Sequence, residues 1–252
     1  LQAFKKPIRI IHQLRDDPSV IAFNLSMTAE MAIFEGVRGI LRENKITPQL
    51  RADIGELLRE LGDIPNPGKY LTTYAILIED GVKNRRKAFN ANYGYDQTLD
   101  IALNVKTTQQ SLIAAVWGYA NKVKEIYETP NLTDRERRDR FRDMGVELRD
   151  DNNPLNALVR RAAPTELYDY TVPIFVRTAH TIFGAIASGE DEYTKAVDPF
   201  SDKPLLKKQT KRGWILYSVG QNEEDDKGEI NTRPTTDGQN NRADYGIEII
   251  KG

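Results

Sequence analysis

The sequence contains no cysteine, and only two histidines and two tryptophans occur among its 252 residues. The lack of cysteine excludes disulfide bonds, thiolate metal ligands and a cysteine nucleophile. No stretch approaches the roughly 18 apolar residues that a membrane helix requires, so we expect no membrane span. Because the first residue is Leu1 rather than methionine, we allow for an N-terminal signal or anchor helix that has been removed.

The sequence also lacks an excess of positive or negative charge. Lys and Arg number 36 against 37 Asp and Glu, which leaves a net charge of -1 and no basic field that would favour nucleic acid as a partner. Signatures of dinucleotide binding, zinc proteases and serine hydrolases are absent as well. The stretch G-D-I-P-N-P-G-K at residues 62–69 has the wrong glycine spacing for a phosphate-binding loop. We therefore predict no catalytic residue.

Before residue 190, apolar side chains recur every three or four residues, as is typical of α-helices. Residues 20–41 carry two such stripes, one of them including Ile21 and Leu25, and predict a central, largely buried helix. Thr47 before Pro48 predicts a helix start, and Thr133 with Glu136 forms a capping-box pattern. Residues 1–190 are thus predicted to form a body of six or seven helices.

The character of the sequence changes near residue 190. The aromatic and β-branched run at residues 213–219 predicts a strand, with partner strands at residues 204–206 and 247–250. Residues 191–252 are therefore predicted to form a small antiparallel β module. The expected fold class is mostly α, and α+β overall.

The loop at residues 221–244 has no helical or strand period and carries seven acids against three bases. Repulsion among these carboxylates would be offset by a hard cation such as calcium, which binds about six to eight oxygens. The alternative is a solvated acidic loop that holds no ion. The spacing of acids and glycine does not fit an EF-hand.

Three motifs follow one another in this region: D-P-F-S-D-K-P-L at residues 198–205, G-W-I-L-Y-S-V-G at 213–220 and D-D-K-G at 225–228. The series, which ends with D-Y at 244–245, resembles the C-terminal end of type II secretion major pseudopilins and of predicted envelope proteins of planctomycete-type bacteria. In those pseudopilins the tail is a short antiparallel sheet with a calcium ion in the loop after the Y-S-x-G strand. The match covers about 50 of the 252 residues.

The resemblance implies the calcium ligands by position. They are backbone oxygens near Leu216 and Val219 and side chains among Asn222, Asp225, Asp226 and Asp244. The sequence departs from the pattern at Asp202, which replaces a glycine, and at Lys227 inside the acidic loop. The helical body is also far larger than the single long helix of a pseudopilin, so assembly into a fibre is not inferred.

Polar residues inside the predicted helices have structural interpretations. We expect His180 to be a packed, hydrogen-bonded histidine, and Glu30 and Glu35 to lie on different sides of their helix and pair with arginine. Pro173 predicts a kink or early break. The arginines at residues 135–142 alternate with acids, which predicts a solvent-exposed helix with surface ion pairs.

These observations favour a non-enzymatic, extracytoplasmic or envelope-associated protein with a helical interaction body and a calcium-stabilised β module. Its partner would be another protein or a second copy of the chain. Two alternatives remain open: an enzyme with a site in a cleft of the helical body, and a cytoplasmic scaffold with a solvated acidic loop.

Overall fold

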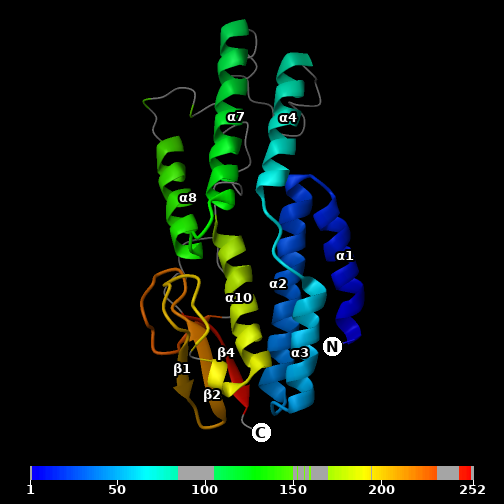
Figure 1. Ribbon diagram of the computed structural model, residues 1–252, viewed down its shortest axis with the longest axis vertical. Coiled ribbons are helices and arrows are strands. Elements are labelled where there is room, and N and C mark those ends of the chain that lie inside the picture. Colours follow the sequence, from blue (N-terminus) through cyan, green and yellow to red (C-terminus); the bar gives the residue numbers. More distant parts are fainter. Residues whose placement is uncertain are drawn as a thin grey trace.

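The computed structural model describes residues 2–84, 105–149, 152, 156, 159, 170–193, 195–231 and 244–250. These residues form an elongated molecule in which a lower bundle of helices carries a small sheet and a second group of helices extends beyond it (Figure 1). The helices are η1 (Gln2–Phe4), α1 (Lys5–Asp16), α2 (Val20–Glu43), α3 (Pro48–Leu61), α4 (Gly68–Asn84), α7 (Lys106–Glu128), α8 (Asp134–Leu148), α10 (Thr171–Ser188) and η3 (Glu190–Glu192). The α+β class and the predicted order, helices before strands, are confirmed.

Helix α2 is the centre of the lower bundle, as its apolar pattern predicts. One stripe, from Phe23 through Met27 and Phe34 to Leu41, is buried against α1, α4, α10 and the sheet. The second stripe is only partly buried, since Ile21 is 72% exposed and Leu25 is 52% exposed. The prediction of burial was wrong at these two positions, because no described element packs against that side of the first turns.

By length and composition α2 is also apolar enough to cross a membrane. The same test is passed by the core helix of a soluble protein, and 56% of the apolar window in α2 is buried within the protein. Helix α2 also carries Glu30 and Arg38, both almost completely buried.

Local sequence signals set several helix ends. The Thr47 hydroxyl accepts a hydrogen bond from the Leu50 N–H at the start of α3, and Thr133 with Glu136 forms the predicted capping box of α8. Pro173 lies in the first turn of α10, where its missing N–H leaves no helical bond unmade. Instead of the predicted kink or early break at Pro173, α10 begins at Thr171, two residues before the proline.

The sheet has the strand order β1-β2-β4-β3. Strands β1 (Leu206–Gln209), β2 (Gly213–Ser218) and β4 (Asp244–Ile250) are antiparallel, and β3 (Ile230–Asn231) runs parallel to β4. The predicted strand at residues 204–206 is shifted, because Pro204 bridges to Val197 and the Leu205 N–H bonds to the Ala196 carbonyl. Strand β3 is two residues long, too short to give a periodic signal.

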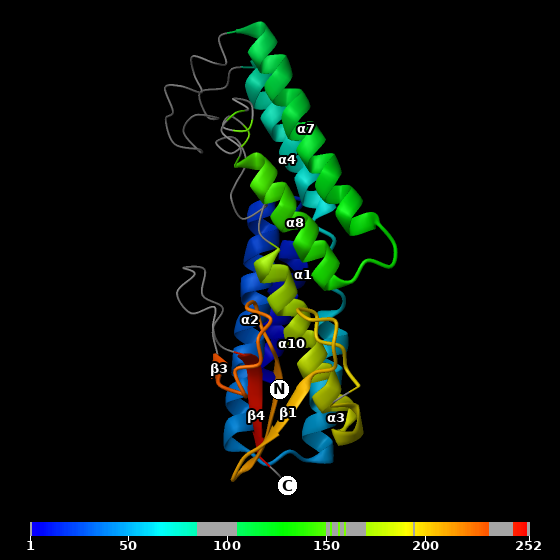
Figure 2. The ribbon, with the colours of Figure 1, turned by 90° about the vertical axis from the view of Figure 1, so that its left-hand side faces the viewer.

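The sheet and the helices share one hydrophobic core. Strand β4 lies against α2 (Figure 2), and the Arg38 guanidinium stacks 4.8 Å from the centre of the Tyr245 ring. Tyr245 also meets Phe175 of α10 edge to face. At the lower end the Ile46 N–H bonds to the Ile250 carbonyl. The β module is thus held by packing along the length of β4.

Gly246 of β4 is expected to tolerate no side chain. A Cβ at this position would lie 2.4 Å from Tyr217 Cβ and 2.6 Å from the Leu216 carbonyl oxygen on the paired strand. Because backbone must move to relieve these contacts, Gly246→Ala should lower the free energy of unfolding by about 1–3 kcal/mol or more. Chemical denaturation measures the change. Gly39→Ala is the matched control, since its Cβ would meet no atom within 4 Å; an equal loss there would contradict the steric explanation.

Candidate cation site in the C-terminal loop

A buried aspartate fixes the point at which the acidic loop leaves β2. Asp198 is 1% exposed and accepts hydrogen bonds from the hydroxyls of Ser218 at 2.6 Å and Ser201 at 2.9 Å. It also accepts from the N–H groups of Phe200 at 3.0 Å and Val219 at 3.2 Å. The aspartate of the D-P-F motif therefore accepts from the Ser218 hydroxyl and the Val219 N–H of the Y-S-x-G motif.

The loop that follows is tightly curled. Glu223 and Lys227 adopt positive φ angles of 59° and 61°, alongside Gly220 at 67° and Gly228 at 73°. Each non-glycine residue in this conformation costs about 1 kcal/mol or more, so contacts elsewhere must hold the loop in shape. Those contacts are made mostly by the loop's own carboxylates.

Asp244, the first residue of β4, is completely buried and closes the loop. Its carboxylate accepts from the Gly228 N–H at 2.7 Å and from the Asp226 N–H at 3.2 Å. Burial raises the pKa of Asp244 to about 6; these two hydrogen bonds oppose that shift, and the charges of Asp225 and Asp226 add to it. Three carboxylates are thus close enough to influence one another.

The other predicted side chains lie in the same turn. Asp225 Oδ1 accepts from the Tyr217 hydroxyl at 3.1 Å and from the Lys227 N–H at 2.8 Å. Asp226 Oδ2 accepts from the Asn222 amide at 2.9 Å. Burial, followed by the bond to Asp225, raises the pKa of the Tyr217 hydroxyl. The oxygens that the resemblance assigns to calcium are therefore partly engaged by protein donors here.

The predicted ligand set is brought together in part. Asn222, Asp225, Asp226 and Asp244 are linked through the loop, whereas Leu216 lies in the middle of β2 between two paired strands. Val219 directly follows β2 and donates its N–H to Asp198. Within the described ranges, no group of three or more acidic or histidine side chains is arranged to hold a metal ion. To bind calcium, the carboxylates would have to exchange some of these N–H and O–H donors for the ion.

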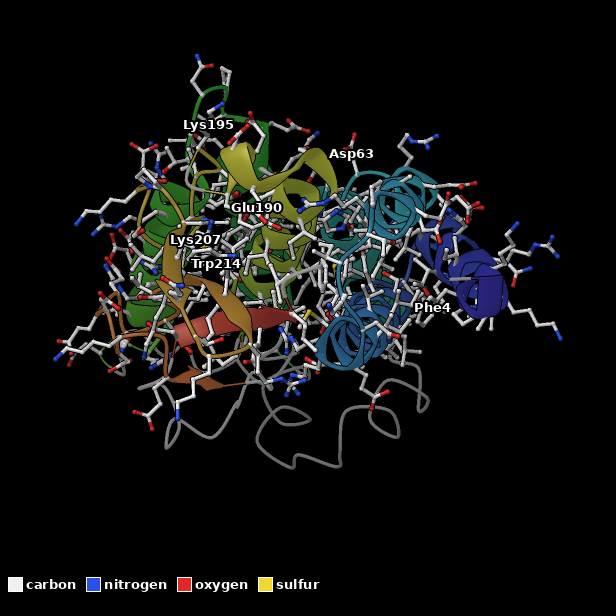
Figure 3. The ribbon with its side chains drawn as sticks, turned by 90° about the horizontal axis from the view of Figure 1, so that it is seen from below. Phe4, Asp63, Glu190, Lys195, Lys207 and Trp214 are labelled. Atoms are coloured by element: carbon white, nitrogen blue, oxygen red, sulfur yellow. The ribbon has the colours of Figure 1, made fainter. Side chains whose placement is uncertain are left out.

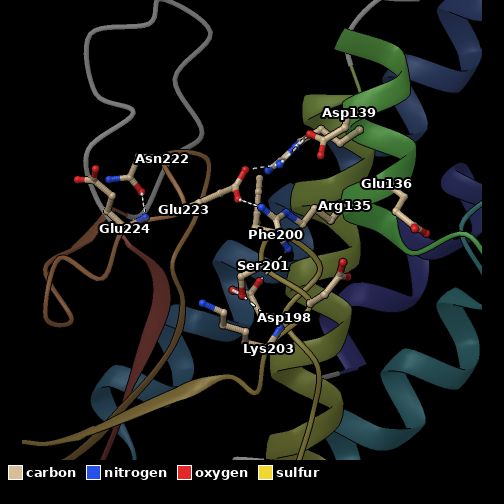
Figure 4. A network of polar contacts seen from close by, with 12 residues as sticks. Arg135, Glu136, Asp139, Asp198, Phe200, Ser201, Lys203, Asn222, Glu223 and Glu224 are labelled. Atoms are coloured by element: carbon tan, nitrogen blue, oxygen red, sulfur yellow. Dashed lines mark hydrogen bonds and ion pairs between the residues drawn. The ribbon is translucent and has the colours of Figure 1, made fainter. Parts of the chain in front are cut away.

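One acidic residue of the loop faces the helical body instead. Glu223 is bound by Arg135 of α8 (Figure 4), with Nη2 at 2.6 Å from Oε2, and also by Arg138 three residues further along the same helix. The Arg138 side chain is only 12% exposed. The prediction of a solvent-exposed arginine helix was therefore wrong for Arg138, whose positive charge is used to anchor the loop. The sequence offered one sign of this contact, because the loop is acidic and the α8 segment is rich in arginine.

A second polar cluster lies inside the helical body. Glu30 of α2 is completely buried, with one carboxylate oxygen bound to Arg15 of α1 and the other 2.5 Å from His180 Nε2 of α10. Arg15 also donates to the Leu61 carbonyl at 2.5 Å. The predicted paired acid and hydrogen-bonded histidine are confirmed. This arrangement joins three helices and leaves neither oxygen of Glu30 without a partner.

In comparisons with known proteins, no family model matches the chain, and no curated protein and no solved structure matches it significantly. The geometry of the loop and of the helical body is accordingly the basis for a functional proposal.

Proposed function

We propose that this is a non-enzymatic, extracytoplasmic or envelope-associated interaction protein whose C-terminal β module is stabilised by calcium. The observation that carries the proposal is that Asp244, at the start of β4, binds the backbone of the turn that holds Asp225 and Asp226, and that the charges of these two residues act on its carboxylate. Like charges placed this close favour an ion that offsets them.

The chemistry of the turn suits a hard cation. The hydrogen bonds given above for Asp225 and Asp226 use one carboxylate oxygen of each residue. Calcium takes about six to eight oxygens, and backbone carbonyls, the Asn222 amide and water would complete such a set. Extracellular calcium modules bind with a dissociation constant of about 10⁻⁴ to 10⁻³ M, which suits surroundings where the ion is plentiful.

A role in binding rather than catalysis is supported by the helical body. Its buried acid, Glu30, is engaged in pairs that join helices rather than left available for proton transfer. Exposed apolar side chains such as Ile76 and Leu77, 52% and 54% exposed on α4, favour contact with another protein or a second copy of the chain.

Thermal unfolding with EDTA and then with added calcium tests the proposal. At ten times the dissociation constant, calcium should add about 1.4 kcal/mol to the free energy of unfolding and raise the melting temperature by about 3–6 °C. The double variant Asp225→Ala, Asp226→Ala should lose this rise because the ligands are gone.

Glu128→Ala, Glu147→Ala is the matched control. These acids are 55% and 63% exposed on α7 and α8 and form only surface pairs with lysine, so the control removes the same charge without touching the loop. It should retain the calcium response. If calcium leaves the melting temperature of the wild type unchanged, the loop is a solvated acidic segment and the calcium proposal fails.

A further inference from the structure

Strand β1 forms a free edge of the sheet. It is the outermost strand in the order β1-β2-β4-β3, and within the described residues β2 is the only strand paired with it. The Thr210 N–H bonds to the Gly213 carbonyl at the hairpin end. Since hydrogen-bonded and non-bonded pairs alternate in an antiparallel ladder, the backbone groups of Lys207 and Gln209 point away from β2.

The free edge is short. The Leu205 N–H, which also points outward in this alternation, already bonds to the Ala196 carbonyl. Among the residues that the structure describes, none bonds to the outward backbone groups of Lys207 and Gln209, which leaves room for an added strand of about four residues. A partner would thus be a short extended segment.

The hairpin that carries this edge is strongly basic. Residues 203–212 contain five basic residues and no acid, in a chain whose net charge is -1. The basic residues are Lys203, Lys207, Lys208, Lys211 and Arg212. Two acids from other segments lie against the hairpin: Glu190 is 3.8 Å from Lys207, and Glu248 accepts from Thr210. They offset only part of the positive charge.

Two of the lysines are held in place by their surroundings. The Lys207 ammonium lies 3.9 Å from the centre of the Trp214 ring and 5.2 Å from that of Tyr193, with Glu190 on the same side (Figure 3). Lys208 points to the opposite face and donates to the Lys227 carbonyl. These contacts fix β1 in an extended form, so little ordering is needed before another strand pairs with it.

We propose that β1 binds a short, acidic, extended peptide of a partner protein, which adds to the sheet as a fifth strand. Backbone hydrogen bonds to Lys207 and Gln209 would supply the pairing, and the basic hairpin would select acidic side chains on both faces. The same lysines repel the β1 edge of a second copy, which disfavours self-association through this strand. The proposal does not depend on calcium binding.

The test uses the full chain and an eight-residue peptide of alternating Glu and Val, with both ends blocked. Titration followed by amide NMR should shift the Lys207 and Gln209 amides and slow their hydrogen exchange. Gln209→Pro removes one outward N–H while leaving the β1–β2 ladder intact, and should weaken binding about fivefold. Gln209→Ala keeps that N–H and should bind as the wild type does.

Charge reversal provides a test that does not depend on proline being accepted. Lys203 and Lys211 are exposed, and the Lys203→Glu, Lys211→Glu variant should weaken binding about tenfold at low ionic strength. An alternating Lys and Val peptide should not bind. The proposal is overturned if polyglutamate or single-stranded polythymidine binds as tightly as the Glu-Val peptide, or if the Lys207 and Gln209 amides gain no protection.

Discussion

Asp198→Ala is expected to lower the free energy of unfolding by about 3–5 kcal/mol, the largest loss for any side chain of the β module. The substitution would leave two serine hydroxyls and two backbone N–H groups without their acceptor in a buried site. Urea denaturation followed by circular dichroism measures the loss. Because Asp198 joins the 198–205 turn to the end of β2, the same variant should also expose the β2 amides to hydrogen exchange.

Two further variants separate this explanation from a simple loss of charge. Asp198→Asn keeps the shape but only one of the two acceptor oxygens, so its N–H₂ group faces either Val219 and Ser201 together or Phe200 and Ser218 together, and an intermediate loss is expected. Asp191→Ala removes an exposed acid from the preceding segment and should change stability by no more than about 0.5 kcal/mol. A loss below about 1 kcal/mol for Asp198→Ala would contradict its assignment as the central acceptor.

Glu30→Gln is expected to cost about 3 kcal/mol, although the side chain keeps its size. The neutral amide would leave the Arg15 guanidinium, whose side chain is 10% exposed, without a counter-charge. The amide has one acceptor oxygen in place of two; if the oxygen faces Arg15, its N–H₂ group can pair with His180 only in the tautomer whose Nε2 accepts. Unfolding in urea at neutral pH measures the effect.

Glu147→Gln is the surface comparison for this change, because Glu147 pairs with Lys122 and both side chains are more than half exposed. It should cost less than about 1 kcal/mol. The double variant Arg15→Met, Glu30→Leu removes both charges and should recover much of the stability lost in Glu30→Gln. If the double variant is no more stable than the single one, the loss does not arise from the unpaired arginine.

Local signals in the sequence were sufficient where the structure is decided by neighbouring residues. Thr47, Thr133 and Glu136 cap their helices as predicted, because a cap depends on residues two to three positions away. The exposure of Ile21 and Leu25 was not predictable in this way. An apolar stripe shows that a helix can be buried, but which side is covered depends on elements far away in the chain.

In the candidate site, too, contacts between residues close in sequence were predictable, whereas contacts between distant segments were not. Asn222, Asp225 and Asp226 share one turn because they are close in sequence, and Asp244 joins them through the pairing of the strands. The attachment of Glu223 to Arg135 and Arg138 was missed, since 85 or more residues separate the partners. The four bonds to Asp198 were likewise hidden, although the two motifs that supply them are present in the sequence.

The position of β4 against α2 sets the order in which the protein can be completed during synthesis. Helix α2 ends at Glu43, whereas β4 begins at Asp244, so about 200 residues are made between the two surfaces that pack together. Closing so long a loop is slow and entropically costly. Until β4 arrives, Arg38 lacks the Tyr245 ring that stacks on it, and β2 lacks one of its two neighbours. Until β4 has been synthesised, the helical body therefore exposes the apolar surface that β4 covers in the folded protein, and this surface favours aggregation and binding by chaperones.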